Sequence, residues 1–139
     1  MLGTTFTRWA EVWNVRAKHI FGEEWFCTDK NGKGIIATTG AGSAPTPPDY
    51  VLMSLGACLG SGVRFMLEKR GKACKNLTIE VEGEFGSQPQ RRIKEMRVKV
   101  SVESDVAKDV LDKIVKQVEE KMCPVGGTLL NPPVIKCTT

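Results

Sequence analysis

The chain has 139 residues and a formal net charge of +4, with 20 Lys and Arg against 16 Asp and Glu. This length suits a single domain, residues 1–139, that buries a core without a disulfide framework. Charges of both signs are interleaved, and no basic stripe with aromatic residues between the charges is present. The composition therefore argues against nucleic acid as a partner.

The N-terminal part predicts short strands. The opening residues, MLGTTFTRWAEVW, lack the long apolar core of a signal peptide, and we expect a cytoplasmic protein. Residues 13–29 contain two strand candidates joined near Phe21 and Gly22. Residues 31–34 (NGKG) predict a turn, and a brief strand, Ile35 to Thr38, follows it. The next segment, GAGSAPTPPD, is a loop rich in Gly and Pro.

A long apolar helix is predicted from about Pro48 to Arg70, with Gly71 as its C-terminal stop. Residues 50–67 carry a single charge, Arg64, and approach membrane-spanning length. Three glycines, two serines and that Arg argue against a membrane partner. An apolar helix buried inside a soluble protein fits the composition better.

Two strands with period-two alternation come next. In LTIEVEGEF the apolar residues alternate with a largely acidic set, and in MRVKVSVE they alternate with a largely basic one. Charges of opposite sign on the two outer faces favour an antiparallel pair joined by a turn at GSQPQ. The two strands therefore predict a hairpin with one solvent-exposed face and one apolar face.

The C-terminal part begins with an amphipathic helix from about Asp105 to Met122. A short helical turn, CPVGGTLL, follows it and ends at Asn131-Pro132-Pro133. A last strand is expected from Val134 to Cys137. The predicted order is β-β-β-α-β-β-α-β, which is an α+β domain with antiparallel sheet.

Five cysteines are present, at positions 27, 58, 74, 123 and 137, and none forms a CxxC pair. An odd number in a reducing compartment indicates free thiols rather than structural disulfides. A zinc site would need four ligands, and His19 is the only histidine. No GxSxG elbow exists for a serine hydrolase. Thiol chemistry is the catalytic option that the residues leave open.

Cys58 and Cys123 have the most suggestive settings. Small residues surround Cys58 in SLGACLGSGVR, which leaves room beside the sulfur, although a small core residue would give the same pattern. Cys123 precedes Pro124, which favours the first position of a helix. At that N-cap, free N–H groups would stabilise a thiolate and lower the pKa of Cys123, unless the residue is simply buried at a helix junction.

The run APTPPDYVLMSLGACLGSGVRFMLEKRG, with the later CPVGGTLLNPP, resembles the osmotically inducible protein C (OsmC) and organic hydroperoxide resistance (Ohr) superfamily. The resemblance covers about Val15 to the C-terminus. It implies an OsmC-like fold, in which antiparallel sheets wrap long central helices in an intertwined homodimer. It also implies reduction of organic hydroperoxides, with Cys58 as the peroxidatic thiol and Cys123 as the resolving thiol.

The sequence departs from the family pattern around the first cysteine. The Ohr and OsmC branches carry a Glu ten residues before that cysteine, where this chain has Pro48. Asp49 resembles instead the acid of the YhfA-like branch. The Arg that the OsmC branch places about twenty residues before its cysteine has no counterpart here. We expect a cation to contact Asp49, with Arg16 as the first candidate and Arg64 as the second.

The resemblance and the residues together predict a cytoplasmic, thiol-dependent peroxidase that reduces organic hydroperoxides. Apolar helix residues, Leu52, Met53, Leu55 and Phe65, are expected to line its site. No metal, haem or flavin cofactor is implied, and turnover would need an external dithiol reductant. The alternative is a non-catalytic protein that binds a small apolar or sulfur-containing ligand at the dimer interface.

Overall fold

A computed structural model describes residues 12–139. The described chain divides into two compact units, one that ends at Asp49 and one that begins at Tyr50. Antiparallel sheets and helices make this an α+β protein, as the sequence predicts. The interpretation of residues 1–139 as one domain stays a prediction.

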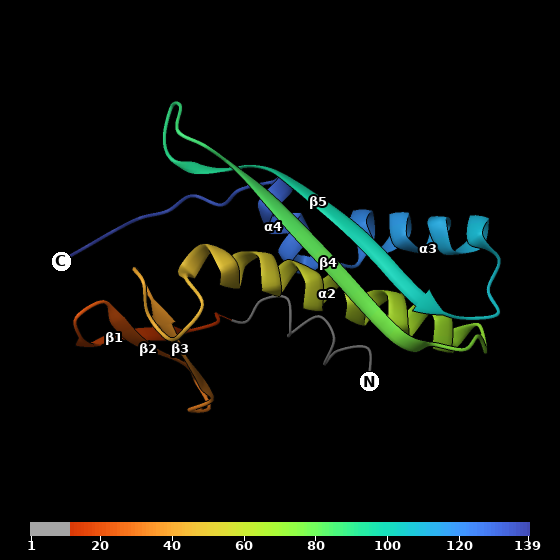
Figure 1. Ribbon diagram of the computed structural model, residues 1–139, viewed down its shortest axis with the longest axis horizontal. Coiled ribbons are helices and arrows are strands. Elements are labelled where there is room, and N and C mark those ends of the chain that lie inside the picture. The colour runs from red at the N-terminus through yellow and green to blue at the C-terminus, as the bar shows by residue number, and fades with distance from the viewer. Residues whose placement is uncertain (1–11) are drawn as a thin grey trace. The chain divides into compact units, whose positions relative to one another are not determined.

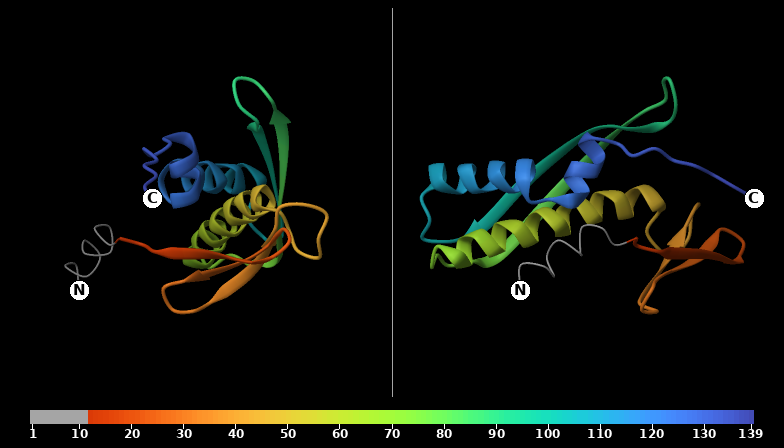
Figure 2. Two further views of the ribbon diagram at one scale, coloured as in Figure 1. Left: turned by 90° about the vertical axis from the view of Figure 1, so that its left-hand side faces the viewer. Right: turned by 180° about the vertical axis from the view of Figure 1, so that it is seen from behind.

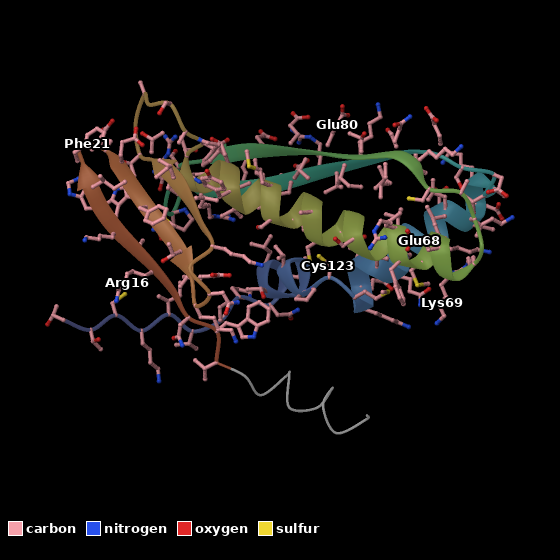
Figure 3. The ribbon with its side chains drawn as sticks, turned by 90° about the horizontal axis from the view of Figure 1, so that it is seen from below. Arg16, Phe21, Glu68, Lys69, Glu80 and Cys123 are labelled. Atoms are coloured by element: carbon pink, nitrogen blue, oxygen red, sulfur yellow. The ribbon has the colours of Figure 1, made fainter. Side chains whose placement is uncertain are left out.

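The first unit holds a three-stranded antiparallel sheet in the order β1-β2-β3. Its strands are β1 (Val15–Phe21), β2 (Glu24–Asp29) and β3 (Gly34–Thr38), as expected from the sequence (Figure 1). Gly22 and Gly32 adopt positive φ angles of 53° and 80° in the two turns, a conformation that costs glycine little. Arg16 and Phe21 mark the two ends of β1 in Figure 3.

Helix α2 (Pro47–Lys69) has the predicted extent. Pro47 occupies its first position, where a missing N–H costs nothing. Gly71, with φ of 67°, follows its last turn, and the amide of Gly71 donates to the carbonyl of Glu68 at 2.9 Å. The two ends of the helix are therefore encoded locally.

The second unit contains a long hairpin of β4 (Lys75–Gly86) and β5 (Arg92–Glu103). Glu82 lies opposite Arg97 in the register, and their side chains form a salt bridge of 2.9 Å. Lys94 and Arg97 both form salt bridges with Glu84, at 3.1 and 3.2 Å. Both lower the pKa of the Glu84 carboxyl, and Lys94 has the larger effect. The predicted charge pairing on the solvent-exposed face of the hairpin is confirmed. Glu80, on the same face, points away from α2 (Figure 3).

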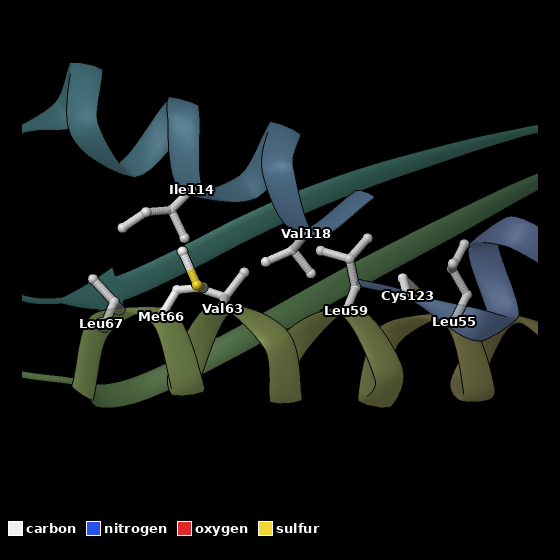
Figure 4. Close-up of a cluster of buried hydrophobic side chains, with 8 residues drawn as sticks. All are labelled: Leu55, Leu59, Val63, Met66, Leu67, Ile114, Val118 and Cys123. Atoms are coloured by element: carbon white, nitrogen blue, oxygen red, sulfur yellow. The ribbon is translucent and has the colours of Figure 1, made fainter. Parts of the chain in front are cut away.

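Helices α3 (Lys108–Lys121) and α4 (Pro124–Leu130) complete the second unit. Figure 2 shows α2 and α3 side by side, with the hairpin laid along one side of them. The apolar side of α2 packs against the apolar side of α3. Together with Cys123, these two sides form the hydrophobic core, which consists of Leu55, Leu59, Val63, Met66, Leu67, Ile114, Val118 and Cys123 (Figure 4).

The expected strand from Val134 to Cys137 is absent, since residues 132–139 have no regular secondary structure. A strand needs a neighbour that accepts and donates its backbone hydrogen bonds, and Pro132 and Pro133 supply no N–H. Val134 and Ile135 are 82% and 83% exposed, so this apolar segment has no covering partner within the described chain. That prediction is wrong for the single chain.

Helix α2 is long and apolar enough to cross a membrane by length and composition alone. Seven of its residues are buried, however, along the stripe that faces α3 and the hairpin. The helix is therefore a core helix, as the sequence predicts. Its burial is one-sided, because Val51, Met53 and Phe65 are 37%, 51% and 52% exposed.

Candidate functional site

Cys58 lies near the middle of α2 and is half-buried. Leu55 and Leu59, one helical turn before it and one residue after it, are 7% and 4% exposed and belong to the core. The Cys58 side chain packs against that core from its edge. Its sulfur therefore combines an apolar surrounding with partial access from outside.

Cys123 is the N-cap residue of α4, as the sequence predicts. Its backbone is extended, with φ of −94° and ψ of 101°, and Pro124 begins the helix. The Cys123 sulfur accepts a hydrogen bond from the amide of Gly126 at 3.3 Å, and the Cys123 amide donates to the carbonyl of Val118 at 3.0 Å. The residue is only 5% exposed. Cys123 is held at a fixed place in the core.

The two thiols meet within one chain. The Cys58 and Cys123 side chains lie close enough to interact in the same core, although 65 positions separate them in sequence. Burial raises the pKa of Cys123, and its interaction with Cys58 raises that pKa further. The amides of Gly126 and Val125 act in the opposite direction and lower the pKa, without offsetting the burial.

The predicted effect on Cys123 therefore has the wrong sign. The helix N-terminus does offer N–H groups to the sulfur, but removing the thiolate from water costs more than those groups contribute. A raised pKa keeps Cys123 protonated at neutral pH. Its protonated thiol lies beside Cys58, and like charge opposes the ionisation of both thiols together.

An apolar cavity of about 310 Å³ adjoins the thiol pair. It is bounded by α2, β5, α3 and α4, and Leu55, Leu59 and Gly126 lie in its wall. Gly126 also donates to the Cys123 sulfur, so this residue belongs to the cavity and to the thiol site at once. A side chain at Gly126 would put its Cβ 3.4 Å from that sulfur. Gly126 is a site residue that the sequence-based prediction missed, although it lies in the CPVGG motif three residues after Cys123.

Of the four apolar helix residues expected to line a site, the cavity contains Leu55. Met53 and Phe65 are exposed instead. Leu52 lies against β4, where its methyl groups are 3.1 Å from the Cβ position of Gly83. The cavity within one chain therefore contains one of the four residues, and a place for the other three in the site stays a prediction.

Comparison with known families fits this site. The sequence profile of the OsmC-like protein family matches residues 40–138, a segment that contains both Cys58 and Cys123. The chain belongs to the OsmC-like protein family. A search of curated proteins gave no significant match.

Several solved structures share the OsmC-like fold of this chain. An OsmC-like protein from Mycoplasma pneumoniae superposes with a TM-score of 0.78 at 16% identity, covering 88% of this chain and 89% of that chain. A hypothetical protein from Aquifex aeolicus gives 0.77 at 23% identity, over 91% and 92%. The organic hydroperoxide resistance protein OhrB of Bacillus subtilis gives 0.55 at 16% identity, over 88% and 93%. At these identities the likeness concerns the fold.

Asp49 has a local role in this OsmC-like chain. Its carboxylate accepts hydrogen bonds from the hydroxyl and the amide of Thr46, at 2.7 and 2.9 Å, and these bonds lower the pKa of Asp49. This reciprocal arrangement at the start of α2 is a capping box. Arg64, the second candidate partner, donates to Glu68 at 2.8 Å instead. Arg16 lies exposed on β1, and its contact with Asp49 stays a prediction.

The other cysteines have settings unlike the thiol pair. Cys27 lies on β2, Cys74 packs against the edge of the core before β4, and Cys137 is exposed in the C-terminal segment. All three are free thiols.

Proposed function

We propose that this OsmC-like protein reduces organic hydroperoxides with Cys58 and Cys123. The Cys58 thiolate attacks the O–O bond, which breaks and releases the alcohol once its oxygen is protonated, leaving Cys58 as a sulfenic acid. The Cys123 thiol then condenses with it, forming a disulfide and releasing water. An external dithiol reduces the disulfide to two thiols and becomes oxidised itself.

The observation that carries the proposal is the proximity of the two thiols in one core. A resolving cysteine must reach the sulfenic sulfur without a large movement, and a direct side-chain contact meets that need. The raised pKa of Cys123 supports this division of roles. Because Cys123 stays protonated, the proposal assigns the role of nucleophile to Cys58.

The solvent exposure of the two cysteines agrees with Cys58 as the nucleophile and Cys123 as the resolving thiol. Cys58 is half-buried, whereas Cys123 is 5% exposed. A peroxide therefore reaches Cys58 more easily than Cys123. The adjoining apolar cavity favours organic hydroperoxides over hydrogen peroxide. Membership of the OsmC-like family indicates a redox or peroxide-related function of the same kind.

The proposal includes a cytoplasmic homodimer. The exposed face of α2, with Met53 and Phe65, and the exposed segment at Val134 and Ile135 leave apolar surface that a second copy would cover. Phe65→Lys should then shift the sedimentation coefficient toward the monomer at micromolar concentration. Thr78→Lys, on the wet face of β4, is the control and should leave the dimer intact. A monomeric wild-type protein would overturn the homodimer.

The decisive test of the activity is mass spectrometry of the reduced protein after one equivalent of cumene hydroperoxide. The expected product is a Cys58–Cys123 disulfide. Cys58→Ser should abolish peroxide consumption, and Cys123→Ser should allow a first oxidation that proceeds to sulfinic acid at Cys58. Cys74→Ser is the matched control, since Cys74 packs against the same core. Equal peroxide consumption by wild type and Cys58→Ser would sink the proposal.

The second candidate function is a non-catalytic protein that binds a small apolar or sulfur-containing ligand. The apolar cavity favours it, together with the absence from the sequence of the family's Arg upstream of Cys58. The rate of Cys58 alkylation at neutral pH separates the two candidates. A slow rate, typical of an unactivated thiol, would favour the binding protein.

A further inference from the structure

Among the residues that the structure describes, the cavity beside the thiol pair has one charged residue in its wall. Eight of its nine lining residues are apolar or glycine, and the ninth is Glu119 of α3. Leu129 and Leu130 of α4 lie in the same wall. A molecule that fills this cavity therefore meets hydrocarbon on most sides and a carboxylate on one.

Glu119 forms no ion pair among the described residues, although charged side chains lie near it. Glu119 also lines a shallow groove between β5 and α3, together with Lys99, Lys116, Asp112 and Glu120. Lys116 pairs with Glu120 at 3.9 Å, and Lys108 pairs with Asp112 at 3.1 Å. Lys99 lines this groove but not the cavity. Within the cavity wall, the Glu119 carboxylate is therefore the one charged group.

The thiol site adjoins the cavity through residues that neighbour the two cysteines, although neither cysteine lies in the cavity wall. Gly126 lies in the cavity wall and donates to the Cys123 sulfur, and Leu55 precedes Cys58 by one helical turn on α2. A substrate whose peroxide group reaches Cys58 consequently places its remaining carbon atoms in the cavity, beside Glu119.

We propose that Glu119 selects substrates by charge, so that this site takes apolar hydroperoxides with a neutral or amine-bearing tail and rejects those that carry a carboxylate. The proposal rests on the peroxidase function above. Two like charges a few ångströms apart at a protein surface repel strongly enough to change affinity by about tenfold. An uncharged tail meets no such repulsion, and an ammonium group is attracted.

The test measures binding with three matched probes: octan-1-ol, octanoate and octylamine. Each displaces the neutral fluorophore N-phenyl-1-naphthylamine from the full-length reduced protein at low ionic strength and about pH 7.5, where octanoate is ionised. Wild type should bind octanoate about tenfold more weakly than octanol, and octylamine more tightly. Glu119→Gln should bring the three dissociation constants close together. Added salt should narrow the wild-type differences.

Glu120→Gln is the control variant, since it removes the same charge from the next residue of α3, which lies outside the cavity wall. It should keep the wild-type order of affinities. An equal effect of Glu119→Gln and Glu120→Gln would overturn the proposal, because net charge alone would explain both. No displacement by any of the three probes from wild type would also overturn it.

Peroxide assays separate this inference from the function on which it rests. Relative to cumene hydroperoxide, which is neutral, the hydroperoxide of a fatty acid should be consumed about tenfold more efficiently by Glu119→Gln than by wild type, through a lower KM. If the protein consumes cumene hydroperoxide but Glu119→Gln leaves the relative affinities for the three probes unchanged, the role of Glu119 is refuted. If Glu119→Gln changes these relative affinities but the protein consumes no peroxide, the peroxidase function is refuted and the charge selection stands.

Discussion

Gly62 sets how closely the helix that carries Cys58 approaches the segment that carries Cys123. A Cβ built on Gly62 would lie 2.4 Å from Cγ1 of Val118. Gly62 follows Cys58 by one turn of α2, and the carbonyl of Val118 accepts the amide of Cys123 at 3.0 Å. The contact between Gly62 and Val118 therefore fixes the spacing of the two thiols. Gly62→Ala should force that spacing to widen.

The magnitude follows from the geometry. The distance of 2.4 Å falls about 1 Å short of an ordinary carbon–carbon contact, and Val118 is fully buried, so any shift of its side chain displaces other core residues. Overpacking of this kind costs about 1–3 kcal/mol, while Ala in place of Gly inside a helix contributes up to about 1 kcal/mol of stability. We expect Gly62→Ala to lower the free energy of unfolding by about 1–2 kcal/mol.

Gly62→Ala should slow disulfide formation between Cys58 and Cys123 more than its modest effect on stability suggests. A shift of a few tenths of an ångström between α2 and α3 lengthens the Cys58–Cys123 contact and slows the step from sulfenic acid to disulfide. Urea unfolding at one protein concentration measures the first effect. Mass spectrometry after excess cumene hydroperoxide measures the second, as a higher yield of Cys58 sulfinic acid relative to disulfide.

A double-mutant cycle with Val118→Ala tests the cause directly. Removing the Val118 methyl groups relieves the clash, so the double variant should be about 1–2 kcal/mol more stable than the sum of the single changes predicts. Gly127→Ala, on α4, is the control, since a Cβ there meets nothing within 4 Å among the described residues. A Gly62→Ala protein that gains stability and keeps the wild-type disulfide yield would refute the reasoning.

Three further results are expected. Thr38→Val should raise the free energy of unfolding by about 1 kcal/mol, because the buried Thr38 hydroxyl has no hydrogen-bond partner within residues 12–139, and urea denaturation measures it. Glu84→Gln should lower the melting temperature at neutral pH, and since the folded state lowers the pKa of Glu84, this loss should shrink once the pH falls below the ordinary glutamate pKa and vanish below the lowered pKa of the folded state. Arg16→Met should slow alkylation of Cys58 at neutral pH severalfold if Arg16 reaches the thiol, and an unchanged rate would remove Arg16 from the site.

Local patterns in the sequence were sufficient to predict most of the fold. The alternation in β4 and β5 places one residue type on each face, so the antiparallel pairing and the Glu82–Arg97 salt bridge follow from the spacing. The limits of α2 follow from Pro47 and Gly71, whose backbone preferences are intrinsic to the residues. The strand expected at residues 134–137 failed because strand formation depends on a partner, which a local pattern does not supply.

The sequence was sufficient to predict the two cysteines of the candidate site, but not their contact or the direction of the Cys123 pKa shift. The CPV motif placed Cys123 at a helix N-cap, and the structure confirms that position. Its contact with Cys58 depends on the packing of α2 against α3, which joins residues 65 positions apart and has no local signature. Only the resemblance to the OsmC and Ohr superfamily implies that pairing from the sequence.

The sign of the Cys123 pKa shift shows why burial has to be known before a thiol is assigned a role. A helix N-terminus stabilises a thiolate when the sulfur remains near water, and the local sequence alone supports that outcome. Here Cys123 lies in the same core as Leu55, Leu59 and Val118, and the loss of hydration outweighs the amide of Gly126. The buried thiol is consequently suited to donate a proton and to resolve a sulfenic acid, and the nucleophile is the cysteine with access to the outside, Cys58.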